Sequence, residues 1–144
     1  MENSTTSSSS QSKLSVVIWE FVSLTKPRVN LLIMFTAIVG MLLAQGRELH
    51  YELILLASLG IGFAASAAAI INHVIDQRID SVMDRTKGRP LVKGNIKPLH
   101  AIYFAIFLSI TSLLMLYIFV NTLTAILTFI SIIIYSFIYS IYLK

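Results

Sequence analysis

Residues 53–80 read LILLASLGIGFAASAAAIINHVIDQRID, a long apolar run that ends in regularly spaced polar residues. About twenty apolar residues are what an α-helix needs to cross the hydrocarbon core of a bilayer. There each backbone polar group must be paired within its own segment, so we expect a helix here. The run Ala57–Ala69 is dominated by small residues, which let helix backbones approach closely in lipid. The stretch therefore predicts a central transmembrane helix of a bundle.

The rest of the chain has the same character. Of its 144 residues, 56% are hydrophobic and only 12% are charged, where a soluble domain carries about a quarter charged residues. Three further apolar blocks lie at residues 29–44, 102–120 and 123–143. We therefore predict an all-α, polytopic transmembrane helical bundle with four spanning helices. The chain has no cysteine, which excludes disulfides, thiolate catalysis and cysteine metal sites.

The N-terminal region differs from these blocks. Residues 1–12 are rich in Ser and Thr and lack apolar side chains, so we predict a disordered tail. Residues 14–24 are apolar but too short to span, and we expect an interfacial helix anchored by Trp19. The predicted domain division is a tail at 1–12 and a membrane domain at 13–144.

The basic residues indicate the orientation. With four spans, all of the 11 Lys and Arg residues except Arg47 fall on one side of the membrane. The positive-inside rule makes that side the cytoplasm, so both termini and the polar loop after the second span are predicted to be cytoplasmic. Because the charges lie between helices rather than along one soluble face, we attribute them to topology and expect no nucleic-acid partner.

Asn72, Asp76 and Asp80 follow one another at intervals of four residues. On a helix such a step turns about 400° and rises about 6 Å, so the three share one face, from which Asp84 drifts further round. Carboxylate and amide oxygens at a membrane boundary suit Mg²⁺, which fills its remaining positions with water and substrate phosphate. Polar residues inside an apolar segment are costly and tend to be functional.

A basic cluster follows directly, formed by Arg85, Lys87, Arg89 and Lys93. Carboxylates and cations this close suit a diphosphate that is bridged to the protein by metal and held directly by guanidinium groups. The chemistry indicated is ionisation of a carbon–diphosphate bond, with the bilayer holding a lipophilic tail. From the residues alone, a solvated loop of mixed charge remains the alternative.

The run NHVIDQRIDSVMDRTKGRPLVKG at residues 72–94 resembles the first aspartate-rich motif of the UbiA-type intramembrane prenyltransferases. Two features resemble the haem O synthase (protoheme IX farnesyltransferase) branch more than the quinone or chlorophyll branches. They are LTKPRV at residues 24–29 and the pattern M-x-R-T-K-x-R at residues 83–89. The resemblance implies a fold of nine helices, of which this chain would supply four, with a catalytic-type cytoplasmic loop at 72–98.

Carried over by position, the resemblance implies a role for each site residue. The metal ligands would be Asn72, Asp76 and Asp80, with Asp84 ranked lower, and Asp76 and Asp80 would be the catalytic pair. The diphosphate would be bound by Arg85, Lys87, Arg89 and Lys93, with Lys26 and Arg28 closing the pocket from the first helix. His73 and His100 are interpreted as ordinary boundary histidines rather than haem ligands.

The implied reaction moves farnesyl from farnesyl diphosphate to a vinyl group of haem b, making haem O for terminal oxidases. Mg²⁺ is the implied cofactor, and the bacterial inner membrane the implied location. No second acidic cluster occurs in this chain, so we expect it to need the remaining half of the fold, or a homo-oligomer, for turnover. Two alternatives stay open: a prenyltransferase for an aromatic quinone precursor, and a truncated, non-catalytic membrane remnant.

The predicted topology can be tested with single cysteines, since the chain has none of its own. We expect Ser81→Cys and Glu48→Cys to react with an impermeant thiol reagent from opposite sides of the membrane. Labelling of intact cells and of inverted vesicles measures this. Equal labelling of both positions from outside would contradict the four-span prediction.

Overall fold

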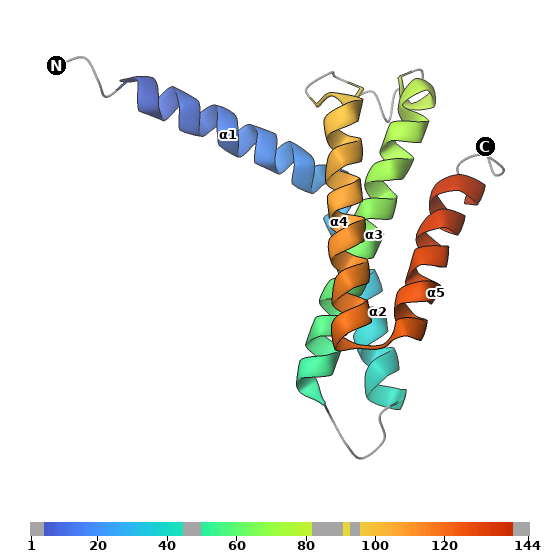
Figure 1. The fold of residues 1–144 in the computed structure, drawn as a ribbon. Coiled ribbons are helices and arrows are strands. Elements are labelled where there is room, and N and C mark those ends of the chain that lie inside the picture. The colour runs from blue at the N-terminus through green and yellow to red at the C-terminus, as the bar shows by residue number, and fades with distance from the viewer. Residues whose placement is uncertain (1–4, 45–49, 82–90, 93–95, 140–144) are drawn as a thin grey trace.

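The computed structural model describes residues 5–44, 50–81, 91–92 and 96–139. These residues form helices, with no strand among them. The helices are α1 (Thr5–Leu24), α2 (Pro27–Ala44), α3 (Tyr51–Asp80), α4 (Pro98–Phe119), α5 (Thr122–Ile133) and the π-helix η1 (Ile134–Tyr139), shown in Figure 1. The prediction of an all-α bundle is confirmed.

Three helical stretches in the described part of the chain are long and apolar enough to cross a membrane. They are Pro27–Ala44, Tyr51–Gln77 and Pro98–Phe119. The fourth predicted span, at residues 123–143, corresponds to α5 and η1, where a shorter apolar helix covers Thr122–Ser136 and residues 140–144 lie outside the described residues. The chain is therefore a polytopic membrane protein in which α5 is the shortest of the four main helices.

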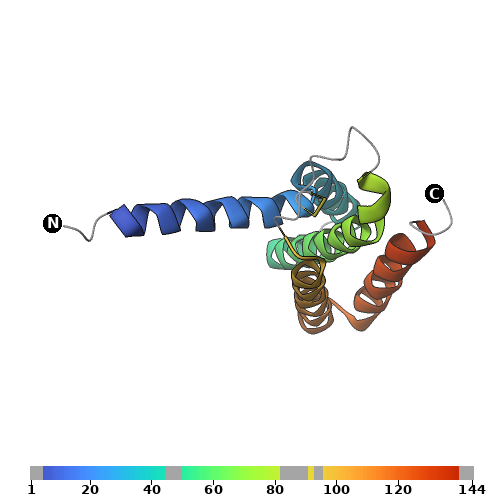
Figure 2. The same ribbon diagram turned by 90° about the horizontal axis from the view of Figure 1, so that it is seen from above.

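Helix α3 is the centre of the bundle, with α2, α4 and α5 arranged around it (Figure 2). A Cβ atom at Gly60 would lie 2.8 Å from a Leu116 methyl carbon, so α4 packs directly against the α3 backbone there. Ser112 Oγ donates a buried hydrogen bond of 2.6 Å to the Gly60 carbonyl oxygen. The predicted close approach of helices at the small-residue run is confirmed.

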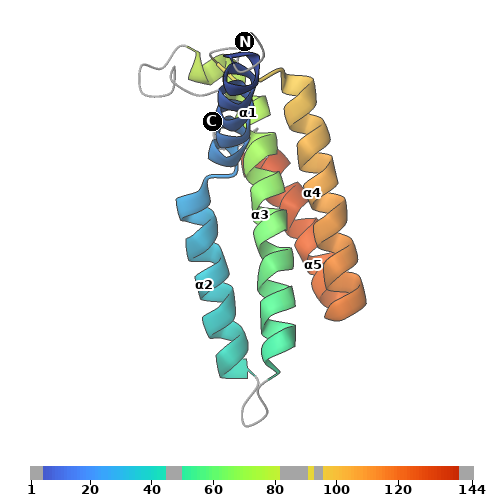
Figure 3. The same ribbon diagram turned by 90° about the vertical axis from the view of Figure 1, so that its left-hand side faces the viewer.

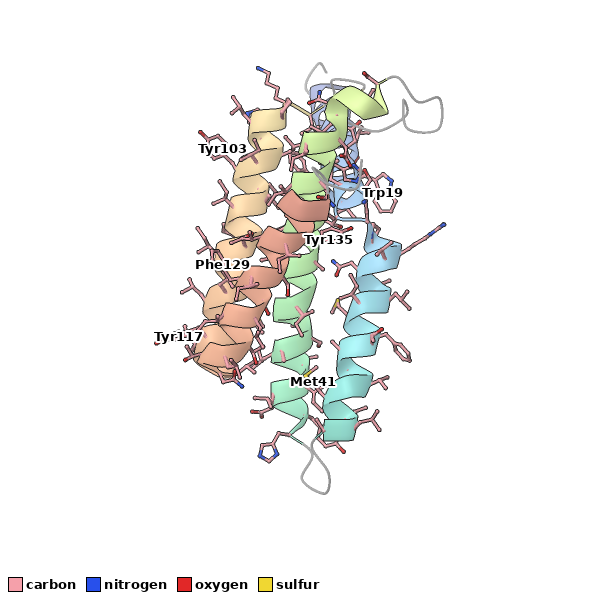
Figure 4. The ribbon with its side chains drawn as sticks, turned by 90° about the vertical axis from the view of Figure 1, so that its right-hand side faces the viewer. Trp19, Met41, Tyr103, Tyr117, Phe129 and Tyr135 are labelled. Atoms are coloured by element: carbon pink, nitrogen blue, oxygen red, sulfur yellow. The ribbon has the colours of Figure 1, made fainter. Side chains whose placement is uncertain are left out.

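The outer faces of the bundle are apolar. Helix α2 has no buried residue, and its Leu31, Phe35 and Leu43 are exposed. On α4, Tyr103 and Tyr117 point away from the bundle (Figure 4). Soluble monomers rarely expose contiguous apolar surface of this extent, whereas lipid tails solvate it without cost.

Helix α1 projects sideways from one end of the bundle (Figures 1 and 2). Its last turns hold it there, because Leu24 is buried in the core and Phe21 meets Phe104 of α4 edge to face, with ring centroids 5.3 Å apart. This arrangement fits the predicted interfacial helix. The helix begins at Thr5 and so includes most of the stretch for which the sequence predicted a disordered tail.

The helix directions alternate along the chain. The start of α2, the end of α3 and the start of α4 lie at the end of the bundle that carries α1 (Figure 3). At the opposite end Asn121 makes the turn between α4 and α5, and its Oδ1 accepts a 2.7 Å hydrogen bond from the Thr124 backbone N–H. The start of α2, the end of α3 and the start of α4 thus share one end of the bundle, and α5 runs back towards that end (Figure 1). Which side faces the cytoplasm stays a prediction.

Gly40 of α2 and Gly60 and Gly62 of α3 are packed differently, so we expect substitution by alanine to change stability differently at each. A Cβ atom added at Gly40 would meet no other atom within 4 Å, whereas one at Gly60 would meet buried Leu116 and one at Gly62 the flexible end of Met34. We expect Gly40→Ala to stabilise the protein by up to about 1 kcal/mol through helix propensity. Gly60→Ala should destabilise it by about 1–3 kcal/mol through overpacking, with Gly62→Ala between them. Thermal unfolding in detergent measures the order, and equal shifts for Gly40→Ala and Gly60→Ala would contradict it.

Candidate functional site

A cavity of about 390 Å³ lies between α2, α3 and α5. The part of α3 that lines it is made almost wholly of alanine. These short side chains do not fill the space between the helices, so a cavity remains. The residues that line it are Thr25, Lys26, Val29, Asn30, Ile33, Ile61, Ala64, Ala65, Ala68, Ala69, Thr128, Ser131, Ile132 and Tyr135. Cavities of this size are typical of small-molecule sites, and the lining here is mainly apolar.

The α3 wall of the cavity leads towards Asn72, Asp76 and Asp80, the three polar residues spaced by four that we call the polar ladder. At about 100° per residue, Ile61, Ala65, Ala68, Asn72 and Asp76 fall within about 80° of one another around the helix axis. Because α3 continues as one helix to Asp80, the predicted ladder and the cavity wall belong to the same face. Asn72 lies about 4.5 Å along the axis beyond the last lining residue of α3.

Asn72 and Asp76 are both buried, with 3% and 9% of their surface exposed. Burying a carboxylate is costly unless it has a polar partner or a cation. A carboxylate and an amide one turn apart supply hard oxygen donors, which suit Mg²⁺, so this part of the donor set fits the predicted metal. Among the described residues no group of three or more acidic, His or Cys side chains gathers in one place, and of Asp80 only the helical backbone is described.

The loop after α3 is tied back onto the bundle at its far end. Gln77 Nε2 donates a 3.0 Å hydrogen bond to the Leu91 carbonyl oxygen, and Leu91 and Ile96 are buried in the main core cluster. These contacts hold both ends of the loop beside the ladder. Its predicted site residues lie outside the described residues, and their roles stay predictions: Asp84, Arg85, Lys87, Arg89 and Lys93.

The structure separates the two cations predicted to close the site from the first helix. Lys26 lines both the cavity and a second groove of about 250 Å³ beside Trp19 of α1, whereas Arg28 lines only the second groove. Arg28 lies in the first turn of α2, which begins at Pro27, and its side chain does not line the cavity. Lys26 also has φ 49°, an unfavourable left-handed conformation for a residue before proline, and it directs the chain from α1 into α2.

Asn30 is a cavity residue that sequence reasoning missed. Its Nδ2 donates to the Gly62 carbonyl oxygen at 3.0 Å and to Ser66 Oγ, which ties α2 to α3. Its buried Oδ1 has no hydrogen-bond partner among the described residues. The signal available in the sequence was a lone amide inside the apolar block of the first span.

Tyr135 is a second cavity residue that is absent from the predicted site. It lies on η1, which continues α5, and its side chain lines the cavity. Of the three histidines in the chain, His73 is buried on α3 and His100 is exposed in the first turn of α4.

Comparison with known proteins gives one consistent result. The sequence profile of the UbiA prenyltransferase family matches residues 33–144. Protoheme IX farnesyltransferase of Alkalilimnicola ehrlichii is 47% identical over 125 residues, which are 87% of this chain and 41% of that protein. Protoheme IX farnesyltransferase 2 of Pseudoalteromonas atlantica is 46% identical, with the same shares covered. The protein of that name from Legionella pneumophila strain Lens is 47% identical, over 87% of this chain and 42% of that protein. The chain spans about two fifths of the length of these curated relatives, and no solved structure gives a significant match.

The placement of the two cations predicts unequal effects on binding of a diphosphate. We expect Lys26→Gln to weaken binding of magnesium pyrophosphate to the purified chain about tenfold, because a cation that faces the site is lost. Arg28→Gln, which removes the same charge on the outer side of α2, serves as the matched control and should change the affinity less than twofold. Isothermal titration calorimetry in detergent measures both. A larger loss for Arg28→Gln than for Lys26→Gln would contradict the assignment.

Proposed function

Because the chain belongs to the UbiA prenyltransferase family, we propose that it forms the donor-binding part of a protoheme IX farnesyltransferase. In this proposal the cavity holds the prenyl tail of farnesyl diphosphate, and the diphosphate lies at the ladder end of α3. The observation that carries the proposal is that one face of α3 lines an apolar cavity and then bears buried Asn72 and Asp76.

The two parts of the donor match the two parts of this face. A prenyl chain is apolar and branched, and the alanine wall with Ile33 and Ile132 offers it a surface free of unpaired charge. The diphosphate is a polyanion, and Lys26 and Thr25 lie where α2 begins, at the same end of the cavity. Farnesyl is the donor that the names of the relatives give, and the sequence motif agrees.

Asn72, Asp76 and Asp80 are the residues we assign to Mg²⁺. Mg²⁺ bound there would neutralise the diphosphate and make it a better leaving group. The loop cations Arg85, Lys87 and Arg89, with Lys93, would bind the same anion directly. Asp84 is assigned the weaker role, since it lies beyond the end of α3.

The proposed reaction breaks the bond between C1 of farnesyl and the diphosphate oxygen, and the diphosphate leaves with the electron pair. The vinyl carbon of haem b bonds to the farnesyl C1. Water then adds a hydroxyl to the resulting cation and releases a proton. The apolar cavity keeps water from the farnesyl cation until the vinyl group has reacted. The relatives' names give protoheme IX as the acceptor.

We further propose that the ladder end of the bundle faces the cytoplasm of a bacterial inner membrane, because the basic residues gather at that end. The family members similar to this chain are more than twice its length. We therefore assign haem binding and completion of the site to the counterpart of their remaining length, or to a partner chain that supplies it.

A chimera tests the proposal. The aligned 125 residues of this chain replace their counterpart in the Alkalilimnicola ehrlichii protein, and the product is expressed in a strain that lacks haem O synthase. We expect haem O in extracted pigments. Asp76→Ala and Asp80→Ala should each reduce it about a thousandfold, because a ligand to the metal is lost, while Asp84→Ala leaves appreciable activity.

Protein levels in the membrane, measured by immunoblot, control for folding. Haem O at the unmodified level from either Asp76→Ala or Asp80→Ala would contradict the metal role. A chimera that is present in the membrane at the level of the parent protein but makes no haem O would contradict the proposed function.

A further inference from the structure

We infer that Ile33, Ile61 and Thr128 form the floor of the cavity and limit the prenyl donor to three isoprene units. The inference rests on the proposed function, which it deepens by assigning the residues that select donor length. It follows from how far the cavity runs along α3 and from what closes it at the end remote from the ladder.

The two ends of the cavity along α3 can be identified from the helix directions. Helices α3 and α5 run towards the ladder end, and α2 runs away from it (Figures 1 and 3). The lining residues nearest the ladder are therefore Lys26, Ala69 and Tyr135. Those most remote from it are Ile33, Ile61 and Thr128, one from each helix.

The length between these ends matches a farnesyl chain. From Ile61 to Ala69 the helix rises about 12 Å, and to Asn72 about 16 Å. An extended chain advances about 1.2 Å per bond, as an extended polypeptide does. An isoprene unit with four main-chain bonds then takes about 5 Å, and three units about 15 Å, by the same advance per bond. A donor anchored at Asn72 thus places the end of its third unit at the Ile61 level.

At the level of the floor, α2 packs directly against α3. A Cβ atom at Gly62, one residue nearer the ladder than Ile61, would lie 2.8 Å from the Sδ atom of Met34, the residue that follows Ile33 on α2, so the two helices are in direct contact there. On the other side of α3, Gly60 packs against Leu116 and accepts the Ser112 hydrogen bond. Helix α3 is therefore in contact with α2 at the level of the floor and with α4 on its other side, and in this inference the α2–α3 contact stops a fourth unit.

Competition binding to the purified chain in nanodiscs tests this inference, with labelled farnesyl diphosphate and Mg²⁺ present. The unlabelled competitors are geranyl, farnesyl and geranylgeranyl diphosphate. We expect the unmodified chain to prefer farnesyl. Ile61→Ala should shift the preference towards geranylgeranyl diphosphate at least tenfold, since pockets of this kind discriminate one methylene by about 10–200-fold. Ala65→Leu, which fills the middle of the cavity, should shift it towards geranyl diphosphate.

The matched control is Ile110→Ala. Ile110 is exposed on α4 and does not line the cavity, so the same truncation there should leave the order of affinities unchanged. Farnesyl binding with an unchanged order in both Ile61→Ala and Ala65→Leu would overturn the floor assignment and leave the proposed function standing. Failure of all three diphosphates to compete on the unmodified chain would overturn the proposed function, and the inference with it.

Discussion

The packing of the bundle depends on side chains of α2 and α4 reaching the backbone carbonyl oxygens of α3. At Gly60 and Gly62 no Cβ covers the carbonyl oxygens, and Ser112 from α4 and Asn30 from α2 donate hydrogen bonds to them. In lipid no hydrophobic effect drives helices together, so close packing and such hydrogen bonds must do so. These two contacts hold α2 and α4 on opposite sides of α3. They also fix how the three helices are aligned along their axes in the rest of the bundle.

Helix α3 packs closely against its neighbours along one part of its length and lines the cavity along the next part. Gly60 and Gly62 allow α3 to pack closely against its neighbours, whereas Ala64, Ala65, Ala68 and Ala69 line the cavity. Further along the helix, the face carries Asn72 and Asp76. Because one rigid helix bears all three features, the distance from cavity floor to polar ladder is set by residue count alone.

The junction between α1 and α2 determines which of its residues reaches the cavity. Lys26 adopts a left-handed backbone conformation immediately before Pro27, and conformations of this kind persist where the surroundings over-determine them. Here Leu24 and Phe21 are anchored in the core on one side, while Asn30 is bonded to α3 on the other. The turn brings Lys26 to the cavity and sends Arg28 to the groove beneath α1.

The sequence by itself determined the helical class, the central place of α3 and the shared face of Asn72, Asp76 and Asp80, because length, small-residue content and a spacing of four are local properties. It also carried the family resemblance, since that motif is contiguous. Only the tertiary structure decided that Lys26 and not Arg28 faces the cavity, and that Asn30 and Tyr135 line it. Those outcomes depend on which helices lie side by side and how far they diverge, and no spacing within a single helix encodes the position of its neighbours.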